Sequence, residues 1–375
     1  MNDNPLLKLR DFDQSIWLDF LSRKLLRSGE LKKLIEEDGL QGMTSNPSIF
    51  NKSITGDDYY KEDIEAMYRE GKEPAEIYET IAVKDVQDAA DIFRPVYDRL
   101  GGKDGFVSLE VNPHLATDVD GTLEEARRLW KGLNRPNVLI KVPATLEGLT
   151  CIRQLISEGI NVNVTLLFGL DRYREVAQAY ISGLEDRVKN GKSVEGISSV
   201  ASFFLSRIDV LVDPLLENAI EAGGIKREYA EKSLGQVAIS CAKEAFQVYK
   251  EFFHGDTFRE LKAKGAAVQR VLWASTSTKN PDYSDVKYVE TLIGPETVNT
   301  VPQETLEAYR DHGNPDFRLE KGLEDARLIL SLLPELGIDM YKIALKLEDE
   351  GVEKFNKPFD NLMSSIGNMC SAAGR

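Results

Sequence analysis

The stretch NVLIKVPATLEGL, residues 137–149, joins an apolar run to the start of a helix, and one lysine interrupts the run. Residues 138–142 are apolar except for Lys141, a pattern typical of a parallel strand that is covered on both faces. An unpaired ammonium group is costly in such surroundings. The place of Lys141 therefore requires an explanation, either as a paired core residue or as a reactive group.

Short runs of the same kind recur along the chain and alternate with segments of helix length. We expect eight strands, at 15–20, 40–45, 106–111, 138–142, 160–168, 197–205, 270–275 and 298–302. Apolar residues at helical spacing predict helices between them, for example at 123–133, 149–159 and 170–188. Eight βα units in roughly 300 residues predict an α/β fold, namely a (β/α)₈ TIM barrel.

The barrel is expected to carry further helices. The connections at 47–105 and 206–269 are too long for a single helix. Residues 303–375 are expected to be mainly helical decoration, a C-terminal extension after the last strand. Because no Pro/Ser-rich linker separates the βα units, residues 1–375 are predicted to form a single (β/α)₈-barrel domain.

Composition is typical of a folded globular protein, with 42% hydrophobic and 29% charged residues. The 47 Lys and Arg against 62 Asp and Glu give a net charge of −15, and no dense basic stripe marks a nucleic-acid or membrane surface. The N-terminus has acidic residues where a secretory signal is basic and apolar, and no run of about 18 apolar residues predicts a spanning helix. We expect a cytoplasmic protein that binds neither nucleic acid nor membranes.

Cysteines and histidines predict neither a disulfide framework nor a metal site. The three cysteines lie far apart, and none of the three histidines has another His or Cys at ligand spacing. No metal is therefore expected. The oligomeric state is left as monomer or homodimer, because no motif distinguishes them.

Two acids and a lysine lie at or near the carboxyl ends of three different predicted strands: Asp19, Glu110 and Lys141. Barrel enzymes place their catalytic groups at these ends. A desolvated lysine amine can attack a carbonyl to form a Schiff base. Cleavage of a neighbouring carbon–carbon bond then needs a base and a proton shuttle, which two carboxyls in different environments can supply.

Each of these residues also has a structural interpretation. Lys141 could be a salt-bridged strand-end lysine, Asp19 could cap the helix that follows it, and Glu110 could be an inward acid with a core partner. Under that hypothesis the chain is a non-catalytic acidic barrel that binds or scaffolds other molecules. Such a protein would form no borohydride-trappable imine.

A second motif, DVDGTL at 118–123, matches the signature of haloacid-dehalogenase-type phosphatases. In those enzymes the motif directly follows a buried strand. Here NPHLAT intervenes and the chain continues as a helix, so Asp118, Asp120 or Thr122 is expected to cap that helix instead.

Six motifs, in order along the chain, resemble the transaldolase family. They are LDF (18–20), MTSNPSIF (43–50), VSLEV (107–111), LIKVPATLEGL (139–149), INVNVTLLF (160–168) and ASFFLSRID (201–209). The resemblance covers roughly residues 12–305. It implies a class I, Schiff-base enzyme of the pentose phosphate pathway that moves a dihydroxyacetone unit from sedoheptulose 7-phosphate to glyceraldehyde 3-phosphate. Erythrose 4-phosphate and fructose 6-phosphate are the products, and no cofactor is needed because the imine accepts the electrons.

The resemblance also implies roles for individual catalytic residues. Lys141 would form the imine, and Asp19 would take the proton from the hydroxyl at the bond that breaks. Glu110 would exchange protons through a water molecule that Thr165 helps to hold.

The same resemblance implies a set of substrate-binding residues: Thr44, Asn46, Asn163, Ser202, Phe204, Arg207, Ser275 and Lys279. Asn46 and Asn163 would bind the hydroxyls of the three-carbon unit, and Ser202 and Arg207 the sugar phosphate. The alternative function is that of a fructose 6-phosphate aldolase-like enzyme, which releases dihydroxyacetone. Those relatives have tyrosine where this chain has Phe204.

One position departs from the pattern of the best-known transaldolases, which carry a second phosphate-binding arginine after the seventh strand. Within WASTSTKNP (273–281) this chain has Ser277 at that position and Lys279 two residues later. The segment STSTK resembles that of a longer transaldolase subgroup, and Lys279 is expected to replace the arginine.

Overall fold

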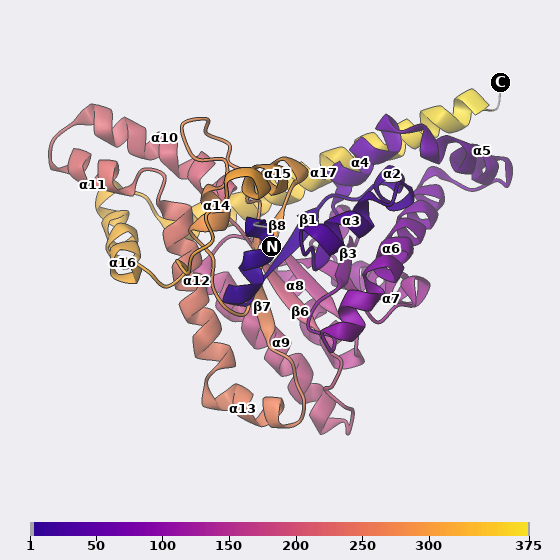
Figure 1. Cartoon of the computed structure of the whole chain (residues 1–375), viewed down its shortest axis with the longest axis horizontal. Helices are drawn as coiled ribbons and strands as arrows, with labels where there is room; N and C mark the ends of the chain where they lie inside the picture. Colours follow the sequence, from indigo (N-terminus) through magenta and orange to yellow (C-terminus); the bar gives the residue numbers. More distant parts are fainter. Residues whose placement is uncertain (1–3, 374–375) are drawn as a thin grey trace.

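The computed structural model describes residues 4–373, and within this range eight parallel strands form a closed barrel (Figure 1). Each strand pairs with the next, and β8 pairs with β1. The strands are β1 (Gln14–Asp19), β2 (Gly42–Thr44), β3 (Phe106–Glu110), β4 (Val138–Pro143), β5 (Val162–Leu167), β6 (Ser199–Phe204), β7 (Gln269–Ala274) and β8 (Thr297–Val301). The predicted TIM barrel is confirmed, and each expected strand overlaps an observed one.

At least one helix follows every strand. The helices between β1 and β4 are α2 (Arg23–Arg27), α3 (Glu30–Glu37), α4 (Pro47–Gly56), α5 (Lys61–Arg69), α6 (Pro74–Arg99) and α7 (Val119–Leu133). Those between β4 and β8 are α8 (Leu146–Glu158), α9 (Leu170–Lys189), α10 (Ser206–Ala222), α11 (Ile225–Ser233), α12 (Val237–Phe253), α13 (Asp256–Ala263) and α14 (Lys287–Glu290). The additional helices expected in the two long connections are therefore present.

The remaining helices lie before and after the barrel strands. They are α1 (Pro5–Lys8), α15 (Gln303–His312), α16 (Leu323–Leu332) and α17 (Met340–Ala373), with short 3₁₀ turns at η1 (Leu9–Phe12), η2 (Asp58–Tyr60), η3 (Pro113–Leu115) and η4 (Pro334–Leu336). The helical C-terminal extension is confirmed. That residues 1–375 form a single domain stays a prediction.

The period of two along β1 places Ser15, Trp17 and Asp19 on one face of the strand, which points into the barrel. Trp17 fills the middle of the barrel and is fully buried. Its indole lies so close to Gly42 of β2 that a Cβ there would be 2.4 Å from Trp17 Cε2. Only glycine leaves room for this packing, which fills the barrel below Asp19.

The amino-terminal end of the barrel is closed by a buried ion pair, which we call the base cluster. Asp104 Oδ1 lies 3.1 Å from Arg270 Nη2 and accepts a hydrogen bond from Trp17 Nε1 at 2.7 Å. Arg270 Nη1 also donates to Ser15 Oγ at 2.7 Å. Both charges have partners, so the cluster ties β1 and β7 to the loop before β3 without leaving a bare buried charge.

The longest helix, α17, runs over the barrel and beside α4 and α5, as the yellow ribbon of Figure 1 shows. It also contacts α6, α10 and β5. Its buried apolar residues recur at helical spacing: Leu347, Phe355, Phe359, Leu362, Ile366 and Cys370. Within residues 4–373, no helix is both long and apolar enough to cross a membrane.

Asp118 of the DVDGTL motif is the N-cap residue of α7. Its side chain accepts a hydrogen bond from Gly121 N at 3.0 Å and caps the start of α7. The motif is therefore used as a helix cap, as expected.

Candidate active site

A cavity of about 310 Å³ opens at the carboxyl ends of the strands. Barrel enzymes place their sites at this end. Ten of the predicted site residues line it: Asp19, Thr44, Asn46, Lys141, Thr165, Ser202, Phe204, Arg207, Ser275 and Lys279. The other two, Glu110 and Asn163, are buried on strands next to Lys141.

Lys141 is central in a row of three inward side chains. The register pairs it with Glu110 of β3 on one side and with Asn163 of β5 on the other. Its Nζ lies 3.3 Å from Glu110 Oε2 and donates a hydrogen bond to the carbonyl of Ser45 at 3.0 Å. These partners explain how a lysine that is 4% exposed is tolerated within an apolar strand.

Burial raises the pKa of Glu110 to about 7, although the neighbouring Lys141 opposes that rise. The nearby Asp19 carboxylate adds to the rise, and Arg207 opposes it. A carboxyl group with this pKa gains or loses a proton readily near neutral pH, as a proton shuttle must.

Asp19 ends β1 at the cavity wall. Its Oδ1 accepts a hydrogen bond from Thr44 Oγ1 at 2.6 Å, and Thr44 Oγ1 also lies 2.8 Å from Thr300 Oγ1. Burial raises the pKa of Asp19, while Lys141 and the Thr44 hydrogen bond hold it down. Asp19 does not cap the following helix, because Ser22 accepts the hydrogen bond from Leu25 N at that end.

Thr165 has an unused hydroxyl at the cavity. Its Oγ1 is buried and has no hydrogen-bond partner among the described residues. Buried hydroxyls are normally hydrogen-bonded. The free hydroxyl lines the same cavity as Lys141 and therefore suits a water molecule or a substrate hydroxyl.

Asn163 is held within the barrel. Its Nδ2 donates to Ser108 Oγ at 3.0 Å, and its Oδ1 accepts from Ser202 Oγ at 2.7 Å. Since both amide atoms have protein partners, Asn163 orients Ser202 in this structure. Direct contact of Asn163 with a substrate stays a prediction.

Arg207 provides a positive charge at the cavity. Its Cζ lies 5.4 Å from the ring centre of Phe204 and 5.7 Å from that of Phe355 on α17. Its Nη1 is buried without a hydrogen-bond partner among residues 4–373. Burial lowers the pKa of Arg207, so an anion placed here would offset the cost of burying the guanidinium.

Two lysines extend this positive region toward solvent. Lys279 lines the cavity, and its Nζ donates to Ser277 Oγ at 2.5 Å. Ser275, at φ 53, lies nearby with its Oγ 2.9 Å from Ser206 Oγ. Lys52 of α4 lines the same cavity. Lys279 therefore contributes positive charge at the cavity, and its replacement of the second arginine stays a prediction.

The residues of this site that the sequence analysis did not single out include Ser45, Lys52 and Phe355. Ser45 and Lys52 lie within or just after the MTSNPSIF motif, so proximity to the motif was a usable signal. Phe355 comes from the C-terminal extension, and nothing in its local sequence indicates the barrel mouth.

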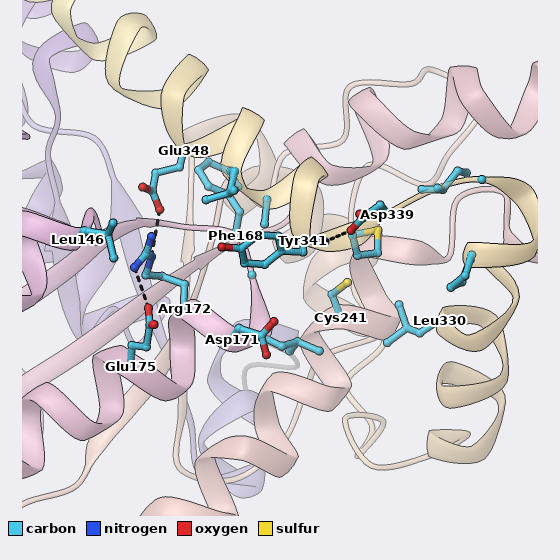
Figure 2. A pocket seen from close by; sticks show the side chains of 18 residues that line it. Leu146, Phe168, Asp171, Arg172, Glu175, Cys241, Leu330, Asp339, Tyr341 and Glu348 are labelled. Atoms are coloured by element: carbon cyan, nitrogen blue, oxygen red, sulfur yellow. Dashed lines mark hydrogen bonds and ion pairs between the residues drawn. The ribbon is translucent and has the colours of Figure 1, made fainter.

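A cavity larger than the active-site cavity lies elsewhere. It is a groove of about 730 Å³ between α9, α12 and the segment from α16 to α17 (Figure 2). None of the predicted site residues lines it. It approaches the active-site cavity through Phe168, whose ring centre is 5.2 Å from that of Phe204.

The closed barrel and the reactive groups at its carboxyl end define a (β/α)₈-barrel enzyme site. The family model described as transaldolase/fructose-6-phosphate aldolase matches residues 16–366. The chain is 47% identical over 370 residues to a protein named transaldolase from Trichodesmium erythraeum, covering 98% of this chain and 97% of that protein.

Two further relatives are also named as transaldolases. Identity is 46% over 371 residues to transaldolase 2 of Nostoc punctiforme, with coverage of 98% and 97%. It is 42% over 361 residues to transaldolase of Neisseria gonorrhoeae, with coverage of 96% and 99%. The chain therefore belongs to the transaldolase/fructose-6-phosphate aldolase family, and its full-length similarity is to the transaldolase enzymes of that family.

Proposed function

We propose that the chain transfers a dihydroxyacetone unit from sedoheptulose 7-phosphate to glyceraldehyde 3-phosphate, in the non-oxidative pentose phosphate pathway. The products would be erythrose 4-phosphate and fructose 6-phosphate. The observation that carries the proposal is the position of Lys141 Nζ at the cavity, 3.3 Å from the Glu110 carboxyl and on the same inner surface as Asp19.

The first half of the reaction builds the imine. Transfer of a proton from Lys141 to Glu110 frees the amine, which attacks the ketose carbonyl carbon. Glu110 then returns protons through water held at Thr165 Oγ1, and the carbonyl oxygen leaves as water. The resulting protonated imine at C2 is positively charged and can accept the electrons of the C3–C4 bond of the ketose.

The second half breaks and remakes a carbon–carbon bond. Asp19 takes the proton of the hydroxyl on C4 of the ketose. The bond between C3 and C4 then breaks, and the aldehyde product leaves. The electron pair remains on the three-carbon unit as an enamine on Lys141. The enamine carbon attacks the carbonyl of the acceptor aldehyde, Asp19 returns its proton, and water hydrolyses the new imine.

Substrate phosphates are proposed to bind at Arg207, with Lys279 and Lys52 as further positive charges. Arginine suits this place because its planar guanidinium can bond two phosphate oxygens. Phe204 offers no hydroxyl to deliver water or a proton to the intermediate, which favours transfer over release. The cytoplasmic location and the monomeric or homodimeric state stay predictions.

Borohydride trapping tests the proposal directly. Protein is incubated with fructose 6-phosphate and sodium borohydride, with and without erythrose 4-phosphate, and the peptides are mapped by mass. We expect a reduced dihydroxyacetone adduct on Lys141, with turnover that depends on the acceptor. An adduct with acceptor-independent release of dihydroxyacetone would indicate a fructose 6-phosphate aldolase-like enzyme. Active, folded protein without an adduct would refute the Schiff base.

The raised pKa of Glu110 predicts the pH dependence. Above about pH 7 the Glu110 carboxyl is ionised and can accept the proton of Lys141, whereas below this value it is already protonated and cannot free the amine. We therefore expect kcat/KM to fall as pH decreases through about 7. Glu110→Gln is expected to lower kcat roughly 10²-fold and to remove this inflection. Rate profiles from pH 5 to 9 measure both effects, and an inflection that persists in Glu110→Gln would assign it to another group.

A further inference from the structure

Helix α17 brings Phe355 to the mouth of the active-site cavity. Phe355 is 4% exposed and lines the cavity. Its ring centre lies 5.9 Å from Lys141 Nζ and 5.7 Å from Arg207 Cζ. One apolar side chain from outside the barrel strands thus lies beside both the amine and the guanidinium.

Phe204 and Phe355 flank Arg207 from two different elements. Phe204 ends β6, and Phe355 comes from the covering helix. Both rings are within about 6 Å of the guanidinium, the range of cation–π attraction. Phe355 therefore contributes to the position of Arg207 and supplies part of the apolar wall around Lys141.

We propose that Phe355 is a specificity-determining residue that keeps water away from the three-carbon intermediate, so that this unit passes to an aldehyde. The inference rests on the proposed function. Transfer forms a carbon–carbon bond between the enamine and the acceptor. Release instead requires a proton on the enamine carbon, followed by water addition at the imine carbon and cleavage of the carbon–nitrogen bond to free dihydroxyacetone and Lys141. Water is a reactant only in release at this stage, so excluding it favours transfer.

The structure holds this part of α17 firmly against the barrel. Glu348 Oε2, seven residues before Phe355 and on the same helix face, lies 3.3 Å from Arg172 Nε of α9. Figure 2 shows Arg172 between Glu348 and Glu175. At Gly351 the helix is so close to β5 that a Cβ would lie 3.0 Å from Leu166 Cδ2. These contacts set the depth at which Phe355 enters the cavity.

The experiment compares three variants with the unaltered protein. Phe355→Ala opens the wall, Phe355→Leu restores an apolar side chain, and Phe359→Ala is the matched control. Phe359 lies one turn further along α17, where its ring packs 5.6 Å from that of Tyr78, and it does not line the cavity. The readout is the ratio of free dihydroxyacetone to transferred unit, with fructose 6-phosphate as donor and erythrose 4-phosphate as acceptor.

We expect Phe355→Ala to raise this ratio roughly tenfold, Phe355→Leu to raise it less, and Phe359→Ala to leave it unchanged. A ratio that stays constant while both rates fall together would overturn the proposal, as would an equal rise in Phe359→Ala. Thermal unfolding of all variants identifies a general loss of structure. Borohydride trapping with the unaltered protein tests the proposed function separately from the role of Phe355. If no adduct forms on Lys141, the proposed function is refuted, whereas an adduct together with an unchanged ratio in Phe355→Ala refutes only the role of Phe355.

Discussion

Lys141→Met is expected to lower the transfer rate on the order of 10⁴-fold or more, because Lys141 supplies the buried nucleophilic amine, whereas Lys52 and Lys279 at the same cavity are exposed. Methionine has a similar length and is apolar, so it fits the surroundings of β4. The variant should give no borohydride-trapped adduct with fructose 6-phosphate. Steady-state rates and peptide mass mapping measure the two losses together.

The fold is expected to survive this substitution. Lys141 holds down the pKa of Glu110, so removing it raises that pKa above about 7 and leaves the carboxyl protonated at neutral pH. A neutral carboxyl is much less costly to bury than an unpaired charge. Thermal unfolding at pH 6.5 should therefore show a folded variant.

Lys287→Met is the matched control, since Lys287 is also a lysine with an acidic partner and its side chain is only 10% exposed. Its Nζ lies 3.0 Å from Asp209 Oδ2, and it does not line the active-site cavity. This control should retain the adduct on Lys141 and its transfer rate, even if it is less stable. Near-normal transfer by folded Lys141→Met would refute the catalytic assignment.

Arg207→Ala is expected to lower kcat/KM for fructose 6-phosphate about 10³-fold and that for unphosphorylated fructose less than about tenfold. Two hydrogen bonds between charged partners, at about 1.5–3 kcal/mol each, total about 4 kcal/mol, which corresponds to a factor near 10³. Arg207→Lys keeps the charge without the planar pair of donors, so an intermediate loss is expected.

Fructose serves as an internal control for the chemistry. Arg207 also lowers the pKa of both Glu110 and Asp19, so its removal changes the acid–base groups for every substrate. That effect is shared by the two sugars and cancels in the ratio of their kcat/KM values. Equal losses for fructose and fructose 6-phosphate would contradict a phosphate-binding role.

The barrel and the position of its site could be predicted because both depend on local patterns. Apolar runs of strand length, separated by helix-length segments, predict the βα alternation. Barrel geometry then places Asp19 and Lys141 at the same end. The direct pairing of Lys141 with Glu110 depends on the register between β3 and β4, which a single sequence does not specify.

Other features depend on contacts between distant parts of the chain. An amphipathic α17 predicts a buried face but not its partner, so Phe355 could not be assigned to the cavity. Lys52 resembles any solvated lysine until α4 is placed at the barrel mouth. The hydrogen bonds that occupy both amide atoms of Asn163 likewise come from Ser108 and Ser202 on two other strands.

The base cluster has a consequence for how such an enzyme can diversify. The ion pair of Asp104 and Arg270 joins the loop before β3 to β7 at the end of the barrel away from the reactive groups. Substitutions around the cavity can therefore alter substrate choice while the contacts that tie β1 and β7 to the loop before β3 stay intact. The description of the family model names two activities, transaldolase and fructose-6-phosphate aldolase. Such a pair can arise when one end of the barrel keeps the fold stable and substitutions at the other end change the reaction.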